Sequence, residues 1–467
     1  ILVIQGAAGS GKTSIALHRI AYLLYHERDS LKSSNVLILS PNGVFADYIS
    51  HILPELGEEN IREMSFDLYA YKELRKGVSA DCEDRYDQLE RRMRFPDQES
   101  QDRFDWKQSK AFIGEIEGFL AVLEDRLIEF KEVYFRGMTL TEEEMIELFY
   151  FKFTETPLLN RMDAIKDYFI DSWETLNGRN ISDDDQETLQ MKFDKMYKTK
   201  DIYAIYNWML EDCGCNLLPD VPYEKRKLPY EDVFPMLYLK YRLSDGNSTH
   251  KNIKHLVIDE MQDYSYLQYT ILEMLFHCRM TILGDRAQTL DTKQQDVLRF
   301  LPKLLGREIR TIEIKKSYRN TLEIARYAEK VSGVSDLELL DRHGKEVVEK
   351  TFNTDTELLD ELVCHLKCPG DFETAALITT TEEEAFDLSR LLKLRGINVS
   401  YVDRNSSAFK KGLTVTTFYL AKGLEFDQVF ALRGAKENPL KNQAEYICAT
   451  RALHELYVYE ITDNLSK

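Results

Sequence analysis

A glycine-rich segment near the start of the chain has the composition of a phosphate-binding loop. An apolar run, residues 1–4, leads into Gly6-Ala-Ala-Gly9-Ser10-Gly11-Lys12-Thr13, which matches the pattern G-x4-G-K-[ST] and is followed by a helical pattern over 14–25. Glycines let backbone N–H groups turn inward around phosphate oxygens, and the helix start adds further donors. Lys12 would place a positive charge at the β- and γ-phosphates of a nucleotide, and the Thr13 hydroxyl would bind Mg²⁺. The expected nucleotide-binding residues are Gly6, Gly9, Ser10, Gly11, Lys12, Thr13 and Ser14.

An acidic pair follows a second apolar run. Residues 256–258 end in Asp259 and Glu260. A carboxylate at the C-terminal tip of a parallel strand, beside a phosphate loop, lies where Mg²⁺ needs an acid, so we expect Asp259 to bind the metal. Glu260 then suits the general base that orients and deprotonates the attacking water. An isolated Asp-Glu pair is usually two solvated acids; the apolar run and the phosphate loop favour the catalytic interpretation here.

Three further polar residues could act on the same phosphates. Gln288 follows the apolar run 281–283, and its amide could sense a γ-phosphate. Arg319 and Arg451 each stand at an expected element boundary further along the chain. A lone arginine is usually a surface residue. Arg319 and Arg451 become catalytic candidates only because of the residues that surround them in the sequence.

These residues need parallel strands to bring them together. Short apolar runs, each ending in a turn and leading to a helical stretch, indicate strands in βαβ units and therefore an α/β fold with parallel sheets. The runs are residues 1–4, 36–39, 256–258, 280–283, 375–378, 413–416 and 428–432.

Residues 81–250 differ from the rest of the chain. They hold 37 acidic and 23 basic residues, a net charge of −14 out of −19 for all 467 residues, together with all three tryptophans. Apolar residues at spacings of three and four between Phe112 and Leu127 indicate helices, and the acidic runs 142–144 and 183–185 resemble helix starts or solvated faces. We expect a separate, mainly helical unit. Its acidic residues either form an ordinary solvated surface or form an acidic face that binds a basic partner.

Composition narrows the class of protein. With 43% hydrophobic and 30% charged residues the chain is an ordinary globular protein, with no membrane-spanning run and no secretion signal, which favours a cytoplasmic location. The seven cysteines lack the paired spacing of a structural zinc site. Because Ile1 already lies in the first apolar run, we expect a fragment that lacks its N-terminal region. The net charge, taken alone, argues against nucleic-acid binding, although most of it lies in one segment.

Six segments, in order along the chain, resemble the motifs of UvrD/Rep-type superfamily 1 helicases. They are Gly6-Ala-Ala-Gly-Ser-Gly-Lys-Thr13, Asp259-Glu-Met-Gln-Asp263, Gly284-Asp-Arg-Ala-Gln288, Ser317-Tyr-Arg-Asn320, Ala421-Lys-Gly-Leu-Glu-Phe-Asp427 and Tyr446-Ile-Cys-Ala-Thr-Arg-Ala452. The resemblance implies two RecA-like P-loop NTPase lobes with ATP and Mg²⁺ in the cleft between them and single-stranded DNA across both. It also implies that Arg319 and Arg451 contact the γ-phosphate, that Gln288 senses it, and that Glu425 contacts the nucleotide sugar. The expected domains are a first lobe of 1–80 and 251–316, an acidic insertion of 81–250, and a second lobe of 317–467.

Three features depart from the strand-separating members of that family. Only 95 positions separate Arg319 from Thr414, too few for the large second-lobe insertion of UvrD and Rep. Tyr419 stands where many members carry a histidine, and the first lobe carries the insertion 81–250.

Together with the segments 40–57, 230–232 and 420–427, these features resemble the HelD branch. This resemblance implies an ATPase that binds bacterial RNA polymerase through its insertion and releases the polymerase from nucleic acid. The alternatives are a DNA helicase of repair or replication, and a binding module without motor activity.

Overall fold

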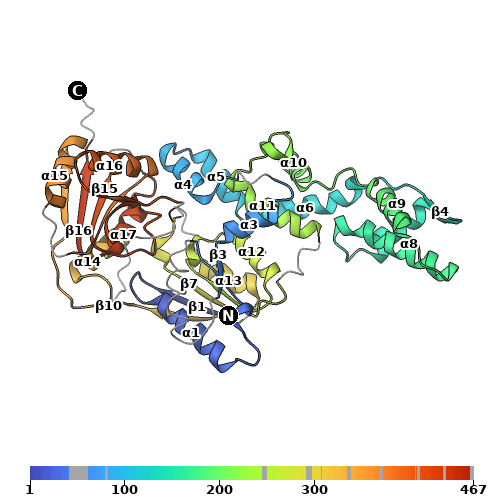
Figure 1. Cartoon of the computed structure of the whole chain (residues 1–467), viewed down its shortest axis with the longest axis horizontal. Coiled ribbons are helices and arrows are strands. Elements are labelled where there is room, and N and C mark those ends of the chain that lie inside the picture. Colours follow the sequence, from blue (N-terminus) through green and yellow to red (C-terminus); the bar gives the residue numbers. More distant parts are fainter. Residues whose placement is uncertain are drawn as a thin grey trace.

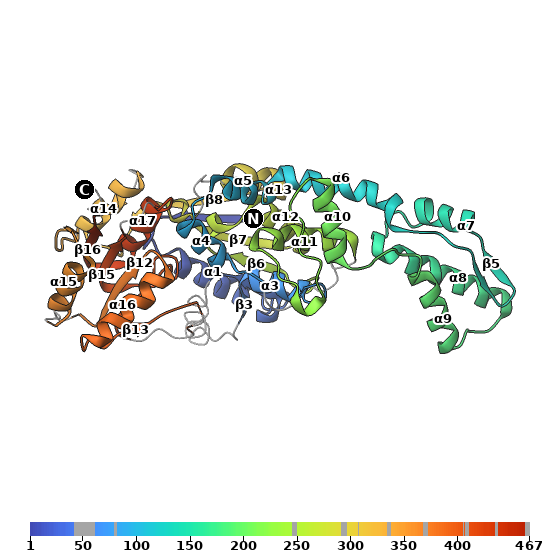
Figure 2. The same ribbon diagram turned by 90° about the horizontal axis from the view of Figure 1, so that it is seen from above.

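The computed structural model describes most of the chain, and the segment at 42–57 quoted above lies outside the described part. The described residues are 1–41, 61–78, 82–244, 250–290, 297–306, 308–333, 338–367, 372–404, 406, 411–434 and 438–462. Two sheet-containing lobes lie side by side, and a helical arm extends away from them (Figures 1 and 2). The fold is therefore mixed α/β with two parallel sheets, as the sequence predicts.

The first lobe is built on a six-stranded parallel sheet with the order β3-β2-β6-β7-β1-β8. Its strands are β1 (Leu2–Gly6), β2 (Val36–Leu39), β3 (Arg62–Met64), β6 (His255–Ile258), β7 (Arg279–Gly284) and β8 (Arg310–Ile314). The interior strands are mostly apolar and buried, as expected for a parallel sheet that is covered on both faces, with polar residues such as Gln5 and Arg279 near strand ends. Only β7 separates β1, which leads to the phosphate loop, from β6, which leads to the acidic pair.

Helices cover both faces of this sheet. Apolar residues of α1 (Lys12–His26) pack with Ile4, Val36 and Val257 on one face. On the other face, α3 (Phe66–Leu74), α11 (Tyr230–Leu243), α12 (Tyr266–Leu275) and α13 (Val297–Leu305) join a core that includes Val3, Leu37 and Leu256.

The second lobe also contains a six-stranded parallel sheet, with the order β11-β16-β15-β12-β14-β13. Its strands are β11 (Val348–Phe352), β12 (Thr374–Thr379), β13 (Ser400–Tyr401), β14 (Gly412–Thr417), β15 (Phe426–Arg433) and β16 (Ala452–Ile461). Its helices are α14 (Leu322–Ser332), α15 (Asp355–Lys367), α16 (Glu382–Leu394) and α17 (Lys441–Arg451). A short parallel pair, β9 (Lys316–Ser317) and β10 (Glu338–Leu339), lies at the entry to this lobe.

The segment between β3 and β6 forms the arm and its base. Its further helices are α4 (Arg85–Arg94), α5 (Gln98–Lys107), α6 (Lys110–Leu127), α7 (Glu142–Glu147), α8 (Arg161–Asn177), α9 (Asp183–Asp194) and α10 (Ile202–Asp212), with a hairpin of β4 (Val133–Phe135) and β5 (Met138–Leu140). The spacing predicted a helix through 112–127, and α6 buries Phe112, Ile116 and Leu123 along that stripe. Both acidic runs begin helices, because Thr141 caps α7 and Ser182 caps α9.

The arm shares its core with the first lobe. One continuous cluster of buried residues runs from the sheet through Phe66 and Phe234 to Phe112 and Trp173. The helix α4 is different, because Leu89 and Met93 pack into the core of the second lobe. Within the described part of the chain, no helix is both long and apolar enough to cross a bilayer.

Candidate active site

The glycine-rich loop connects β1 to α1 and takes an unusual backbone conformation at two of its glycines. Gly9 and Gly11 have φ angles of 73° and 79°, a left-handed conformation that glycine adopts at little cost. No side chain caps the N-terminus of α1, and within the loop the Ser10 N–H donates to the Ala7 carbonyl at 3.2 Å. Ser10 is buried, and Thr13 and Ser14 are half-buried. These features fit a nucleotide phosphate in the loop.

The segment after β9 holds Arg319 against this loop. Ser317 Oγ donates a hydrogen bond to the Ala8 carbonyl at 2.9 Å, and the Tyr318 N–H donates to the Gly9 carbonyl at 3.1 Å. A Cβ atom on Gly9 would lie 2.3 Å from Arg319 Cβ, so this position has room only for glycine. Two segments more than 300 residues apart in sequence thus form one surface.

Lys12 lies inside the site and contacts its own loop. Its Nζ donates to the carbonyls of Gly6 at 2.7 Å and Ala7 at 2.9 Å. Burial lowers the pKa of Lys12, although Asp285 and Glu260 act in the opposite direction. A phosphate near Nζ would add negative charge and favour the ammonium form.

The acidic pair stands at the end of β6. Glu260 has a φ angle of 52°, a sparsely populated conformation for a residue with a side chain, which turns it out of the strand direction. Burial, followed by the charge of Glu260, raises the pKa of Asp259. Burial alone would also raise the pKa of Glu260, but Lys422 and Lys12 outweigh it and the pKa is lowered. Glu260 is therefore the member of the pair that ionises first, as a general base requires.

Asp259 and Thr13 are the residues that would hold Mg²⁺. Asp259 directly follows β6, and Thr13 lies in the first turn of α1, after the loop that follows β1. The Asp259 N–H donates to the Leu39 carbonyl at 2.9 Å. One carboxylate, one hydroxyl and phosphate oxygens form the kind of ligand set that Mg²⁺ takes in nucleotide sites. The cation would neutralise phosphate charge during transfer.

Gln288, Arg451 and Glu425 meet between the two lobes. Gln288 Nε2 donates to Asp285 Oδ2 at 2.8 Å, and Arg451 Nη2 donates to Gln288 Oε1 at 3.2 Å. Burial and the nearby Arg319 lower the pKa of Arg451 to about 10, so this guanidinium still carries its charge at neutral pH. Glu425 forms an ion pair with Arg319. The structure thus brings Lys12, the acidic pair, Gln288 and the two arginines close together between the lobes, and Glu425 contacts Arg319 in this arrangement.

Two residues that the sequence did not predict join the site, the buried Lys422 and the half-buried Glu63. Lys422 Nζ lies 2.8 Å from Asp263 Oδ2 and 3.8 Å from Glu260 Oε2, so the second lobe supplies a cation to the acidic pair. Glu63 on β3 lies near Asp259, and burial followed by that carboxylate raises the pKa of Glu63 to about 8. Lys422 lies three positions before Glu425 in a quoted motif, which was a usable signal. Glu63 has no comparable signal in the sequence.

Comparison with known proteins identifies the family. The sequence model described as the UvrD/REP helicase N-terminal domain matches residues 1–290, more than half of the chain. This chain belongs to the UvrD/Rep helicase family. Among solved structures, the C-terminal domain of a possible DNA helicase from Lactobacillus plantarum WCFS1 is similar, with 25% identity over 31% of this chain and 88% of that domain, at a TM-score of 0.26. No curated protein matches the chain.

Family membership settles the general activity. UvrD/Rep helicases are ATP-hydrolysing enzymes that use Mg²⁺ and act on nucleic acid, and this chain is an enzyme of that general kind. The glycine-rich loop, the acidic pair and the two arginines are groups of the types that phosphoryl transfer to water uses.

Proposed function

We propose that the chain is a superfamily 1 motor ATPase of the HelD-like branch, which remodels bacterial RNA polymerase or releases it from nucleic acid. In this proposal Lys12 and Arg319 bind the γ-phosphate, Glu260 activates water, and Arg451 stabilises charge that develops in the transition state. Gln288 senses the γ-phosphate, and Glu425 binds the nucleotide sugar after it leaves Arg319. The domain boundaries are those expected from the sequence, with 81–250 as the insertion between parts of the first lobe.

The acidic arm is the observation that carries the branch assignment. The arm projects from the lobes in both views (Figures 1 and 2), and residues 110–212 hold 23 acidic and 12 basic residues. Glu142, Glu143, Asp183 and Asp184 are exposed at the starts of α7 and α9. A projecting negative surface suits a basic protein channel that otherwise holds nucleic acid.

The environment of Tyr419 supports the same assignment. Tyr419 is buried, and its hydroxyl donates a hydrogen bond to Glu90 Oε1 at 2.5 Å. At this position many relatives carry a histidine, for which a contact with DNA is expected by resemblance. Here the side chain instead contacts α4.

A binding experiment with the whole chain tests the proposal. Immobilised core RNA polymerase should retain the wild-type chain at low salt. A variant with Glu142→Gln, Glu143→Gln, Asp183→Asn and Asp184→Asn should bind at least about tenfold more weakly, because four exposed charges are lost. The matched control neutralises exposed acids of the second lobe, Asp341, Glu346, Glu349 and Asp355, and should bind normally. Absence of wild-type binding, or equal losses in both variants, would reject the polymerase assignment.

The alternative is a DNA-translocating helicase of repair or replication, which the family match alone would also fit. Under that alternative, single-stranded DNA should strongly stimulate ATP hydrolysis, and RNA polymerase should have no effect. Stimulation by polymerase and not by DNA would favour the HelD-like assignment.

A further inference from the structure

The helix α4 packs against the second lobe, although the segments before and after it are attached to the first lobe. Leu89 and Met93, 8% and 6% exposed, belong to the core of the second lobe together with Phe418 and Phe426. The ring of Tyr86 stacks on Tyr419 with the centroids 5.3 Å apart. One face of α4 is thus packed as part of the second lobe.

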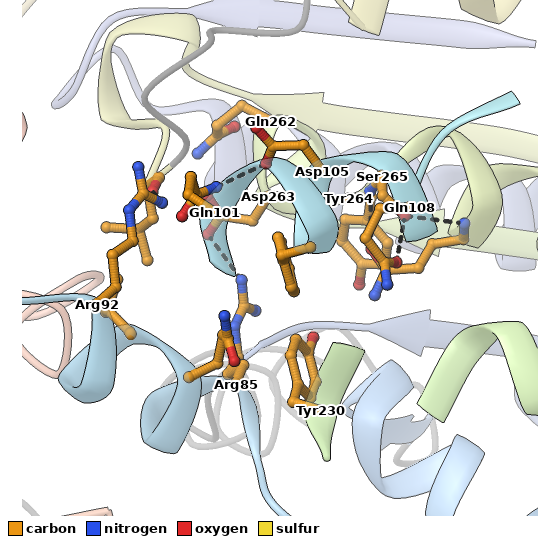
Figure 3. Close-up of a pocket in the computed structure, with 15 residues that line it drawn as sticks. Arg85, Arg92, Gln101, Asp105, Gln108, Tyr230, Gln262, Asp263, Tyr264 and Ser265 are labelled. Carbon is orange, nitrogen blue, oxygen red and sulfur yellow. Dashed lines mark hydrogen bonds and ion pairs between the residues drawn. The ribbon is translucent and has the colours of Figure 1, made fainter. Parts of the chain in front are cut away.

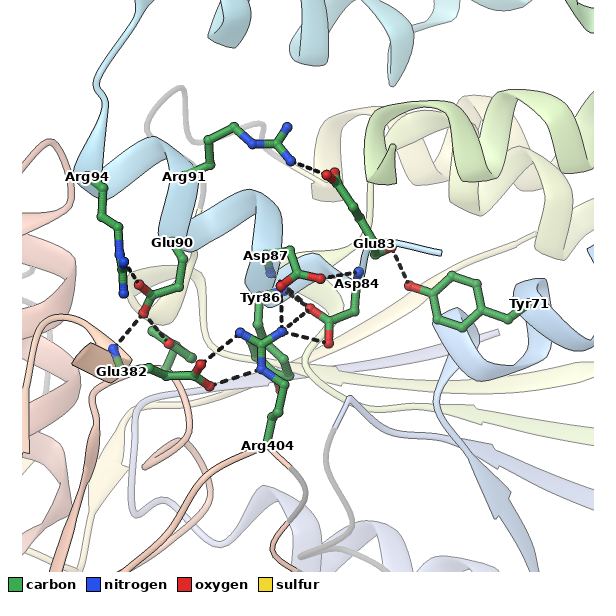
Figure 4. Close-up of polar contacts among 11 residues, drawn as sticks. Tyr71, Glu83, Asp84, Tyr86, Asp87, Glu90, Arg91, Arg94, Glu382 and Arg404 are labelled. Atoms are coloured by element: carbon green, nitrogen blue, oxygen red, sulfur yellow. Dashed lines mark hydrogen bonds and ion pairs between the residues drawn. The ribbon is translucent and has the colours of Figure 1, made fainter. Parts of the chain in front are cut away.

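Charged groups surround that packed face (Figure 4). Arg404 of the second lobe donates to Asp84 at 3.1 Å and Asp87 at 2.7 Å, and it also pairs with Glu382 of its own lobe at 2.9 Å. Glu90 accepts a hydrogen bond from the backbone N–H of Glu382 at 2.8 Å. Burial opposes the charge of Arg404, but Glu382 and Asp87 outweigh it and hold the pKa of the guanidinium above its usual value. Arg404 therefore donates several short charge-assisted hydrogen bonds to carboxylates of both α4 and its own lobe.

The opposite face of α4 meets the first lobe through longer contacts and a cavity. Arg85 lies 3.6 Å from Asp263, and Arg92 donates to the Leu290 carbonyl at 3.5 Å. A cavity of about 120 Å³ separates α4 from α5 and from the segment that follows Glu260, and its lining includes Gln101 and Tyr264 (Figure 3). On this side α4 also contacts α11, so the helix is held by the first lobe as well as by the second.

The ends of α4 are nevertheless tied to the first lobe. Just before the helix, the Glu83 N–H donates to the Leu228 carbonyl at 3.1 Å, and the Tyr71 hydroxyl on α3 donates to the Glu83 carbonyl at 3.0 Å. After the helix, residues 95–97 lead directly into α5. A helix fixed at both ends on one lobe and packed into the other restrains their separation.

We propose that α4 is a latch between the lobes: its docking on the second lobe, through Arg404, Tyr419 and the buried Leu89 and Met93, holds the lobes together, and its release lets them separate. Lobe opening then requires α4 to leave the second lobe or to stretch its connections. Because α4 leads through residues 95–97 into α5 and the arm, a ligand that pulls on the arm acts on the cleft through this helix.

A distance measurement in nucleotide-free protein tests the latch independently of ATP hydrolysis or polymerase binding. Spin labels on p-acetylphenylalanine at Tyr25 of α1 and Leu394 of α16, 70% and 77% exposed, report the separation of the lobes without using the cysteines. Wild-type protein should give one narrow distance distribution. Arg404→Ala should add a longer-distance population, with the ratio of open to closed molecules raised about tenfold or more, as expected for the loss of charge-assisted bonds.

Two further variants separate a latch from a general loss of structure. The double variant Asp84→Asn and Asp87→Asn removes the charges from the α4 side while keeping an amide that can cap the helix, and it should open the lobes in the same way. Combined with Arg404→Ala it should add little more, because both changes break one contact. Arg395→Ala is the matched control, since it breaks an exposed pair with Asp360 on the same lobe and should leave the distribution unchanged. An unchanged distribution in Arg404→Ala, or additive effects in the combined variant, would overturn the proposal.

Discussion

The base of the arm depends on a buried ion cluster, and replacing its lysine provides a test of how the arm is held. Lys107 Nζ on α5 lies 2.6 Å from Asp232 Oδ1 and 3.0 Å from Glu231 Oε1 on α11, and the Lys107 side chain is only 3% exposed. Lys107→Met keeps the apolar stem and removes the charge. Loss of one partner from a buried pair costs about 3–5 kcal/mol, because a charge remains buried without compensation. Glu231 still has Arg103 at 3.0 Å, and Asp232 still accepts from Tyr206, so we expect about 3 kcal/mol.

Hydrogen exchange of amides in α5 and α11 measures this loss locally, which avoids assuming a two-state transition for the whole chain. Arg126→Met is the control in the same insertion. Arg126 pairs with Asp212 at 3.1 Å, but both side chains are more than one third exposed, so its loss should cost about 0–1 kcal/mol. Equal, small effects for the two variants would show that the cluster does not anchor α5 to α11.

The effect of Lys107→Met should also depend on pH. Burial raises the pKa of Asp232 even though Lys107 lowers it, so removal of Lys107 should raise that pKa further. A carboxyl group with a raised pKa in the folded state favours folding at low pH and loses that contribution as pH rises through the folded pKa. The destabilisation by Lys107→Met should therefore shrink when pH is lowered from about 8 to about 5. A penalty that stays constant over this range would contradict the electrostatic explanation.

Three further predictions concern the lobes. Burial, followed by the charge of Arg279, lowers the pKa of His255 to about 4, so as pH falls the unfolded chain binds a proton before the folded chain does. The free energy of unfolding of the first lobe should therefore fall by about 2 kcal/mol between about pH 7 and pH 5. Denaturation of His255→Gln should not show this loss. Arg451→Ala should reduce ATP hydrolysis at least about 10³-fold while calorimetry still detects nucleotide binding, and normal hydrolysis would remove Arg451 from the proposed mechanism. Gly9→Ala should lower the melting temperature more than Gly11→Ala does. Both positions have positive φ, but only a Cβ atom at position 9 would collide with Arg319. Equal shifts in melting temperature would mean that the loop and Arg319 move apart at little cost.

Local patterns in the sequence indicated most of the interior strands and the candidate residues of the site. Apolar runs predicted the four interior strands of the first sheet and three of the four interior strands of the second, because a strand covered on both faces is largely apolar. The fourth, β16, was not predicted, because His454 and Glu455 interrupt its apolar residues. The phosphate loop and the acidic pair could be recognised because each is a short run whose residue types the chemistry restricts. Their convergence at one edge also followed from the sequence, because the carboxyl ends of parallel strands meet there.

Contacts between distant segments were decided only by the tertiary structure. The acidic composition of 81–250 indicated a separate unit, yet α4 packs into the second lobe and α11 into the core of the first, because each helix buries whichever face a neighbour completes. Lys422 gained its role in the same way, from carboxylates about 160 residues away. Charge and periodicity are properties of a segment, whereas the partner of a buried charge or a helix face is a property of the folded chain.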